Sequence, residues 1–238
     1  MLPVVILAGG LATRLYPVTR SIPKSLITIH GQPFIDHQLA LLKEKGVSKV
    51  ILCVANLGNM IENHVGNGSR YGLDVNYSYD GKELLGTGGA IKKASRLLPD
   101  TFIVLYGDSY LDIDFQRVVQ HFQHQSFPVL MTVFKNQNKY DTSNICMKEG
   151  KIVRYDKKFH DVTMEYIDYG LIVIRREVFD VYPTNESFDL SLVLSRLVNA
   201  GQVTGYEVTQ RFYEIGSISG IRETEQYIMN RTVDHHME

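Results

Sequence analysis

Short apolar runs and amphipathic segments alternate along the first half of the chain. The run at residues 4–7 is continuous and apolar, as expected of a buried parallel strand. Further strands are predicted at 50–54, 74–79 and 101–106, and helices at 34–45, 57–65 and 87–98. Gly46 and Pro99 supply stop signals for the first and last of these helices. This alternation of strand and helix predicts a parallel sheet with helices on both faces.

The second half of the chain is richer in strands. Strands are predicted at 127–134, 143–147, 151–155, 166–174, 203–208 and 212–215, and helices at 188–200 and 219–230. The pattern changes near Ser126 without a linker, a repeat or a low-complexity tract. We therefore predict a single α/β domain over residues 1–238, with a Rossmann-like, mixed but mostly parallel sheet flanked by helices. Residues 1–125 would form its core, and residues 126–238 a smaller β-rich lobe with the closing elements.

Composition narrows the classes of partner. The chain has 25 Lys and Arg against 26 Asp and Glu, a net charge of −1, so neither nucleic acid nor a membrane surface is indicated as a partner. The longest apolar run, at 127–134, is too short to cross a bilayer, and the start of the chain lacks a signal-peptide pattern. Cys53 and Cys146 lie in apolar runs, as expected of buried, reduced thiols. We expect a cytoplasmic protein, and a homo-oligomer is compatible with the sequence.

Glycines and an aspartate follow two of the predicted parallel strands. Gly9-Gly10 comes directly after the first strand, and Asp108 follows the fourth. In open parallel sheets, ligands bind outside the carboxyl ends of the strands, so we expect these residues at one ligand-binding edge. Asp108 taken alone has a second interpretation, as a turn residue or a helix N-cap.

The loop after Gly10 carries Thr13 and, within eleven residues, the cations Arg14, Arg20 and Lys24. Glycines allow backbone N–H groups to approach phosphate oxygens, and guanidinium and ammonium groups neutralise the charge. The spacing matches neither a dinucleotide-binding G-x-G-x-x-G nor a Walker A loop. A tight turn alone would explain the glycines but has no use for three cations, and a solvated basic loop stays an alternative for Arg20. The stretch therefore predicts a nucleoside triphosphate site.

The stretch LAGGLATRLYPVTRSIPKSL resembles the signature of the sugar-1-phosphate nucleotidyltransferases, roughly L-A-G-G-x-G-T-R-L-x-P-x-T-x-x-x-P-K. The similarity continues through GQPFIDHQL, LLGTGGAIKKA, YGDS and YEIGS, and so covers nearly the whole chain. LLGTGGAIKKA is most similar to guanylyltransferases for D-glycero-D-manno-heptose 1-phosphate, and GNGSRYGLDVNYS is similar to uridylyltransferases for N-acetylmuramate 1-phosphate. Ala12 departs from the signature, where glycine is usual, and alanine tolerates a left-handed backbone less easily.

The resemblance implies a nucleotide site at the predicted edge. The triphosphate would lie along the loop, with Arg14 on the β- and γ-phosphates that leave as pyrophosphate. The segment 86–88 would lie against the base and the sugar, and Thr87 would also cap the helix that follows. The implied nucleotide-binding residues are Leu7, Ala8, Gly9, Gly10, Thr13, Arg14, Asp80, Gly86, Thr87 and Gly88.

Asp80, a little upstream of that segment, has two interpretations. Its carboxylate could accept hydrogen bonds from the N1–H and N2–H groups of guanine. In the context Tyr79-Asp80-Gly81, it also suits an exposed turn at the surface, which is the more ordinary role for an aspartate followed by glycine.

The catalytic residues that the resemblance implies are Arg14, Lys24 and Asp108. Lys24 would meet the α-phosphate and the incoming sugar phosphate, and Asp108 would hold Mg²⁺. Glu214 matches the second metal ligand, which is more often aspartate in the family. Attack of one phosphate on another brings two anions together, and Mg²⁺ with in-line cations lowers that repulsion. A sugar 1-phosphate is already ionised near neutral pH, so no general base is required.

The second lobe would bind the sugar phosphate. Asp156-Lys157 resembles the family's E-K pair, in which the acid takes sugar hydroxyls and the lysine takes the phosphate, and Lys158 offers a rival cation. Tyr169-Gly170 would lie over the sugar ring, and Asn144 would line the pocket. The implied sugar-phosphate-binding residues are Lys24, Asn144, Asp156, Lys157, Tyr169 and Gly170.

These residues favour an enzyme that converts an NTP and a sugar 1-phosphate into an NDP-sugar and pyrophosphate. The favoured pair is GTP with a heptose 1-phosphate, and the alternative is UTP with N-acetylmuramate 1-phosphate or a hexose 1-phosphate. A non-catalytic regulatory subunit that binds nucleotide sugars is the alternative class, and the presence of Arg14, Lys24 and Asp108 argues against it. A dinucleotide oxidoreductase lacks its glycine spacing here.

Overall fold

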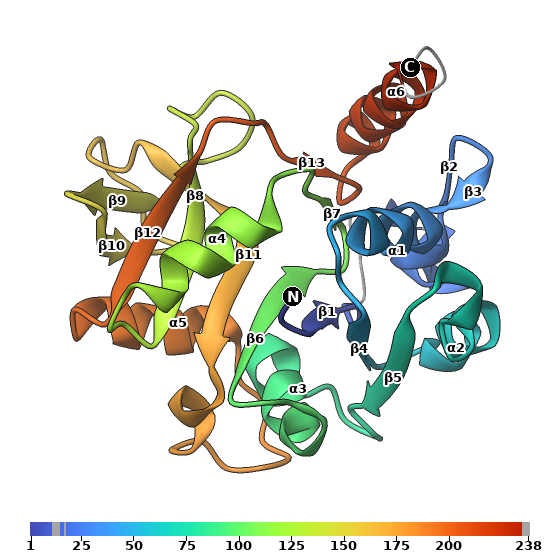
Figure 1. The fold of residues 1–238 in the computed structure, drawn as a ribbon, viewed down its shortest axis with the longest axis horizontal. Helices are drawn as coiled ribbons and strands as arrows, with labels where there is room; N and C mark the ends of the chain where they lie inside the picture. Colours follow the sequence, from blue (N-terminus) through green and yellow to red (C-terminus); the bar gives the residue numbers. More distant parts are fainter. Residues whose placement is uncertain (11–14, 17, 235–238) are drawn as a thin grey trace.

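The computed structural model describes residues 1–10, 15–16 and 18–234. The four strands of the first half run parallel, in the order β5 (Asp74–Tyr79), β4 (Lys49–Val54), β1 (Val4–Leu7) and β6 (Thr101–Tyr106) (Figure 1). Val4, Val5 and Ile6 of β1 are fully buried, because this strand has a neighbour on each side and packed side chains on each face. The predicted parallel sheet of the first half is therefore confirmed.

Five strands of the second half extend the same sheet beyond β6. They are β11 (Tyr166–Arg175), β8 (Val129–Lys135), β12 (Val203–Val208), β10 (Lys151–Tyr155) and β9 (Ile145–Lys148), in that order. β11 runs antiparallel to both β6 and β8, whereas β8 and β12 are parallel. The predicted mixed sheet is confirmed. The division into two lobes at residue 125 stays a prediction, since strands from both halves share one sheet.

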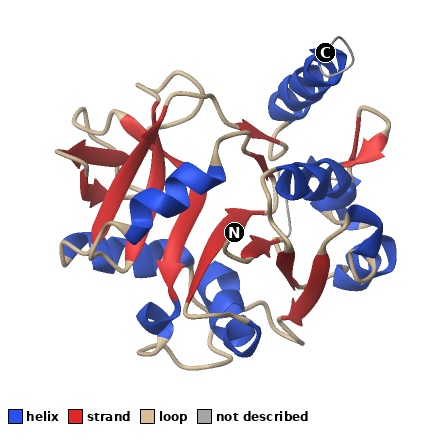
Figure 2. Ribbon diagram, viewed as in Figure 1, coloured by secondary structure: helices blue, strands red, loops and turns tan. Residues whose placement is uncertain are grey.

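Helices cover both faces of this sheet, as predicted (Figure 2). On one face, α1 (Phe34–Glu44), α2 (Gly58–Val65) and α4 (Phe115–Gln123) pack with Val4 and Ile6 of β1. On the other face, α3 (Gly86–Ala94) and α5 (Leu190–Asn199) pack with Val5. Successive residues of a strand point to opposite faces, so one apolar run supplies both core layers.

The prediction missed α4, although its sequence carries a start signal. The Asp114 carboxylate accepts a hydrogen bond from the backbone N–H of Arg117 at 3.0 Å and so caps the helix. Val118, Val119 and Phe122 then form its buried face.

Two short strand pairs lie outside the large sheet. β2 (Thr28–Ile29) pairs with β3 (Gln32–Pro33), and β7 (Ser109–Tyr110) pairs with β13 (Tyr213–Glu214), which precedes the last helix, α6 (Ile218–Asp234). Short 3₁₀ segments lie at Val18–Arg20, Lys24–Leu26, Ser69–Tyr71, Ser95–Leu97 and Arg176–Phe179. Both cysteines, Cys53 and Cys146, are buried free thiols, as predicted. Within the described ranges, no helix combines the length and apolar character needed to cross a membrane.

Candidate active site

Two adjoining clefts contain most of the predicted site residues that the structure describes. The first cleft, of about 320 Å³, is lined by Leu7, Ala8, Gly9, Gly10, Lys24, Ser25, Cys53, Asp80, Leu84, Gly86, Thr87, Ala90, Tyr106, Gly107, Asp108 and Asp189. The second, of about 580 Å³, is lined by Tyr106, Asp108, Ser109, Tyr140, Asp141, Thr142, Asn144, Lys157, His160, Ile167, Asp168, Tyr169, Gly170, Phe212, Glu214 and Ser217. Tyr106 and Asp108 line both, so the two clefts meet at the carboxyl end of β6.

The loops after β1 and β6 meet because of one glycine. The backbone N–H of Gly107 donates to the carbonyl of Leu7 at 3.0 Å. A Cβ at Gly107 would lie 2.6 Å from that same oxygen, closer than packing allows. The Gly9-Gly10 loop and Asp108 are therefore held side by side, as the edge argument predicted. Thr13 and Arg14, together with Ala12, lie outside the described residues.

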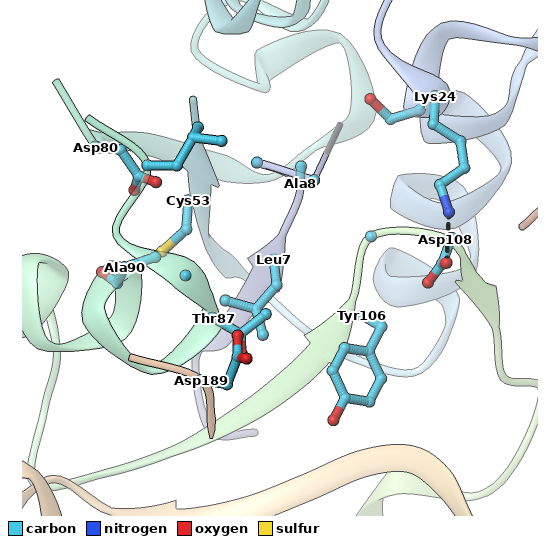
Figure 3. A pocket seen from close by; sticks show the side chains of 16 residues that line it. Leu7, Ala8, Lys24, Cys53, Asp80, Thr87, Ala90, Tyr106, Asp108 and Asp189 are labelled. Carbon is cyan, nitrogen blue, oxygen red and sulfur yellow. Dashed lines mark hydrogen bonds and ion pairs between the residues drawn. The ribbon is translucent and has the colours of Figure 1, made fainter. Parts of the chain in front are cut away.

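Lys24 and Asp108 form an ion pair at one side of the first cleft (Figure 3). The Lys24 Nζ lies 2.6 Å from Asp108 Oδ2, and the two side chains are 17% and 28% exposed. Lys24 opens a 3₁₀ segment directly after Pro23, whose fixed φ restrains the approach to it. Both charges are partly shielded from water yet open to the cleft, where they can interact with an anionic ligand or a cation.

Asp80 lies at the other side of the first cleft, with Cys53 and Thr87 (Figure 3). The expectation of a surface turn is wrong, because Asp80 is only 8% exposed. Its Oδ2 accepts from the backbone N–H of Leu85 at 2.9 Å, and burial raises the pKa of its carboxyl. A buried acceptor at this position suits the donors of a bound base.

The segment 86–88 packs against the start of α5. A Cβ on Gly86 would lie 2.7 Å from the carbonyl oxygen of Phe188, and one on Gly88 would lie 2.5 Å from its ring. The expectation that Thr87 caps its own helix is wrong. It lies inside α3, and its Oγ1 accepts from the backbone N–H of Leu190 at 2.8 Å. Gly86 and Thr87 line the first cleft, whereas the glycine at 88 is needed for packing against Phe188.

Lys157 projects into the second cleft. Its Nζ lies 3.2 Å from the Tyr106 hydroxyl, 3.7 Å from Asp168 Oδ2 and 4.7 Å from the centre of the Tyr106 ring. Burial lowers the pKa of Lys157, but the charge of Asp168 and the neighbouring Tyr155 raise it by more, so the net pKa is raised. The side chain is therefore a cation in the cleft.

Two other predicted sugar-site residues also line the second cleft. The Asn144 Oδ1 accepts from the backbone N–H of Asp168 at 3.0 Å, which ties the start of β9 to β11. Gly170 has a φ of +101°, and a Cβ there would lie 3.3 Å from the Tyr106 ring, so this position favours glycine on both counts. Asn144 shapes the cleft by fixing the backbone at Asp168, and Gly170 shapes it by letting the backbone pass close to Tyr106.

The side chains of Asp156 and Tyr169 are engaged elsewhere. The Asp156 Oδ1 accepts from the backbone N–H groups of Lys158 and Phe159, at 2.8 and 3.0 Å, and these bonds lower the pKa of its carboxyl. Asp156 does not line the second cleft. Tyr169 is only 2% exposed and packs edge-on against Phe212 in the core, so it borders the cleft from beneath. Their roles at a sugar stay predictions.

Glu214 is brought to Asp108 by the pairing of β7 and β13. Glu214 lies opposite Ser109, and the backbone N–H of Ile215 donates to the carbonyl of Asp108 at 3.0 Å. Its carboxylate accepts from the Gly216 N–H and, at 2.8 Å, from the Ser217 hydroxyl. The two acids thus border one cleft, although they lie more than 100 residues apart in sequence.

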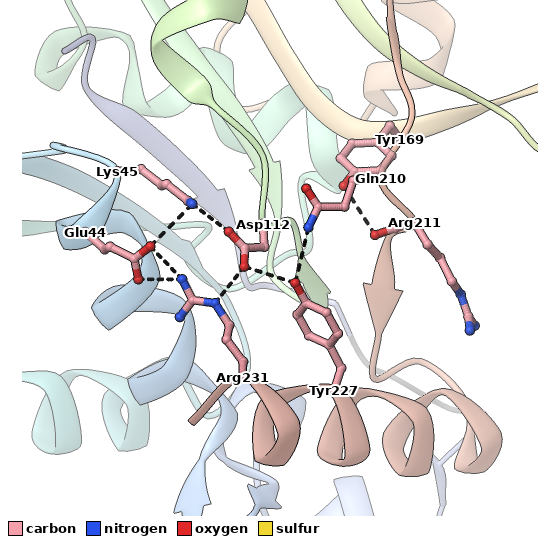
Figure 4. A network of polar contacts seen from close by, with 8 residues as sticks. All are labelled: Glu44, Lys45, Asp112, Tyr169, Gln210, Arg211, Tyr227 and Arg231. Carbon is pink, nitrogen blue, oxygen red and sulfur yellow. Dashed lines mark hydrogen bonds and ion pairs between the residues drawn. The ribbon is translucent and has the colours of Figure 1, made fainter. Parts of the chain in front are cut away.

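A polar network anchors α6, the helix that follows Glu214 (Figure 4). Arg231 donates to Glu44 at the end of α1 and to Asp112, while Lys45 lies 2.6 Å from Asp112. The Tyr227 hydroxyl donates to Asp112 at 3.0 Å. These contacts join the C-terminal helix to the first half of the chain and so hold β13 against β7.

The donor set of the two acids fits Mg²⁺. Among the described residues, no three His, Cys, Asp or Glu side chains gather as a cluster able to hold a metal ion. Mg²⁺ prefers one or two carboxylates completed by phosphate oxygens and water, rather than a full cage of protein ligands. Asp108 and Glu214, at the border of the cleft that holds the Lys157 cation, offer that kind of site.

The residues that sequence reasoning missed include Ser25, Cys53 and Asp189 in the first cleft, Asp168 in the second, and Tyr106, which lines both. Asp168 carries a visible signal, because it is an acid inside the apolar run of β11. Cys53 and Asp189 reach the cleft only through the packing of β4 and α5.

Comparison with known proteins identifies the family of the chain. A family model described as Nucleotidyl transferase matches residues 3–231. A D-glycero-alpha-D-manno-heptose 1-phosphate guanylyltransferase from Aneurinibacillus thermoaerophilus is 30% identical, over 77% of this chain and 79% of that protein. An N-acetylmuramate alpha-1-phosphate uridylyltransferase from Neisseria meningitidis is 28% identical, over 92% and 95%.

The crystal structure of HddC from Yersinia pseudotuberculosis complexed with GMP-PN matches the fold with a TM-score of 0.81, at 25% identity, over 96% of this chain and 100% of that one. The chain spans only 60 to 63% of the length of two further curated relatives, a mannose-1-phosphate guanylyltransferase subunit and a UTP–glucose-1-phosphate uridylyltransferase. Because the family model covers nearly all of the sequence, the chain belongs to the nucleotidyl transferase family.

Proposed function

We propose that this protein transfers a nucleotidyl group from an NTP to a sugar 1-phosphate and releases pyrophosphate. The observation that carries the proposal is the meeting of two clefts at Asp108, beside Lys24. One cleft has a glycine loop and a buried acceptor, Asp80, and the other has the cation Lys157. A two-substrate phosphoryl reaction needs such an arrangement, because both substrates must be held close together in line.

The proposed reaction is a single displacement at the α-phosphorus of the NTP. An oxygen of the sugar 1-phosphate attacks the α-phosphorus of the NTP, the bond to the β-phosphate bridging oxygen breaks, and pyrophosphate leaves. Lys24 would neutralise charge at the α-phosphate, and Lys157 would hold the sugar phosphate. Asp108 and Glu214 would hold Mg²⁺, which supplies further neutralisation of the triphosphate when bound. Arg14, outside the described residues, would meet the leaving pyrophosphate.

We propose GTP and a heptose 1-phosphate as the favoured pair. Asp80 supports guanine, since its buried carboxyl lies opposite Lys24 across the first cleft and guanine presents two adjacent N–H donors. The similarity to a heptose 1-phosphate guanylyltransferase supports the sugar. UTP with N-acetylmuramate 1-phosphate is the second candidate, because the Neisseria relative matches almost end to end.

The test is a pyrophosphate-release screen of all NTPs against a panel of sugar 1-phosphates with Mg²⁺. We expect release with one pair and its loss in Lys24→Ala, with NTP binding retained. Lys148→Ala is the matched control, because Lys148 is exposed on β9 and lines neither cleft. No release with any pair would refute catalysis and favour a non-catalytic nucleotide-sugar-binding subunit. Full activity of Lys24→Ala would refute the role of that lysine.

A further inference from the structure

A nearly buried carboxylate lies beneath the second cleft. The side chain of Asp168, on β11, is 3% exposed and yet borders the cleft. A buried negative charge opposes the binding of a phosphate unless it is paired, because the low-dielectric surroundings screen it poorly. The partners of Asp168 therefore decide whether it hinders or helps an anionic ligand.

The carboxylate of Asp168 is held in a fixed orientation. Its Oδ1 accepts from the backbone N–H of Gly170 at 3.1 Å. Its Oδ2 accepts from the hydroxyl of Tyr106 at 3.2 Å and from that of Tyr155 at 3.5 Å. The backbone N–H of Asp168 is itself held by Asn144. One oxygen is thus fixed by the strand, and the other faces the side chains of the cleft.

The Lys157 ammonium lies on that second oxygen. It is 3.7 Å from Asp168 Oδ2 and 3.2 Å from the Tyr106 hydroxyl, with the Tyr106 ring beneath it. A lysine side chain has several freely rotating bonds, so an unheld ammonium would sample many positions. The Lys157 side chain remains 41% exposed, which leaves part of the ammonium open to a ligand.

We propose that Asp168 is a positioning residue, which fixes the ammonium of Lys157 where it meets the phosphate of the sugar 1-phosphate. This inference rests on the proposed function, which supplies the ligand of Lys157. Asp156, next to Lys157 in sequence, does not take this part, since its carboxylate caps the turn at Lys158 and Phe159. The acid that serves Lys157 comes from a different strand.

The kinetic test compares wild type, Asp168→Asn, Lys157→Met and the double variant with the active substrate pair. We expect the KM for the sugar 1-phosphate to rise roughly 10- to 100-fold in Lys157→Met, because this variant loses a charged hydrogen-bond donor to the phosphate. The KM should rise by a smaller factor in Asp168→Asn, which loses only the 3.7 Å ion pair that holds the ammonium. The KM for the NTP should stay within about twofold. In the double variant, the KM for the sugar 1-phosphate should be no higher than in Lys157→Met, because Asp168 acts through Lys157.

Asp100→Asn is the matched control, because its carboxylate pairs with Arg176 and is 91% exposed before the start of β6. Additive effects of the two single changes would overturn the proposal, since they would mean that Asp168 contacts the substrate by itself. An unchanged KM for the sugar 1-phosphate in Asp168→Asn would overturn it as well. If Asp168→Asn does not fold, Tyr106→Phe takes its place in the cycle. Tyr106→Phe should then raise the KM for the sugar 1-phosphate, and combining it with Lys157→Met should not raise that KM above the value for Lys157→Met alone.

A second measurement separates this inference from the proposed function. Acetylation of Lys157 by acetic anhydride, followed by mass spectrometry, needs no turnover. We expect it to be several-fold faster in Asp168→Asn than in wild type, because the ammonium loses its anchor and its charge partner. Acetylation of Lys148 should not change. Equal rates at Lys157 would overturn the positioning role, whereas absence of turnover with faster acetylation would refute the proposed reaction alone.

Discussion

Substitution of Gly107 by alanine tests how closely the two loops of the site approach each other. An ideal Cβ at Gly107 would lie 2.6 Å from the Leu7 carbonyl oxygen and 3.0 Å from the Ala8 Cα. Both obstacles are backbone atoms, so neither can rotate aside as a side chain would. The φ of Gly107 is not positive, so alanine has no backbone strain and the whole penalty is steric.

The expected magnitude follows from these distances. Overpacking usually costs about 1–3 kcal/mol, and the upper half of that range applies where the obstacle is backbone. Replacement of glycine by alanine returns about 0.4–1 kcal/mol by restricting the unfolded chain. The net loss of unfolding free energy is therefore about 1–2.5 kcal/mol. For a chain of this size, the Tm should fall by about 2–10 °C.

Activity should fall as well, because the hydrogen bond from Gly107 to Leu7 would lengthen and carry Asp108 away from Lys24. Denaturant unfolding and pyrophosphate release measure the two effects. Gly10→Ala is the control for stability, since a Cβ there meets nothing within 4 Å among the described residues. A Gly107→Ala protein that is as stable as Gly10→Ala and as active as wild type would refute the close approach of the loops.

Two further predictions concern buried polar groups of the first cleft. Ser25 is 3% exposed, and its hydroxyl lacks a hydrogen-bond partner among the described residues. Ser25→Ala should therefore leave the unfolding free energy unchanged or raise it. A loss above about 1 kcal/mol in denaturant unfolding would contradict this prediction. Burial, with the charge of Asp80, raises the pKa of Cys53 to about 12, so the thiol stays protonated until the pH approaches that value. Iodoacetamide at pH 8 should leave native Cys53 unmodified, and rapid alkylation would show that the thiolate is accessible.

Local patterns predicted most of the elements. β5, β6, β10 and β12 begin and end at the predicted residues, because apolar runs of strand length with turn signals at their ends were present in the sequence. The helix α4 was missed even though Asp114 and three apolar residues indicate it. It lies between the predicted strands at 101–106 and 127–134, so the alternation of strand and helix also favours a helix there.

The candidate site was predicted less evenly. The rule that ligands bind at the carboxyl ends of parallel strands placed Gly9, Gly10 and Asp108 together, and the structure agrees. The surface turn at Asp80 was wrong, because Asp80 is buried and accepts from Leu85, five residues further along the chain. The cap at Thr87 was wrong, because its hydroxyl bonds to Leu190, on a segment that no local pattern connects to it. Asp168 was overlooked for the same reason, since its partners come from β6 and β10.

The sequence by itself determined the strands, most helices, the edge where Gly9, Gly10 and Asp108 meet, and the family signature, because each depends on short stretches of the chain. Only the tertiary structure decided which charges meet. Lys24 reaches Asp108 across 84 residues, and β13 brings Glu214 beside them. Lys157 finds its acid on β11 instead of in its neighbour Asp156. Such contacts depend on the order and register of strands in the sheet, which many weak packing energies fix together and no single stretch encodes.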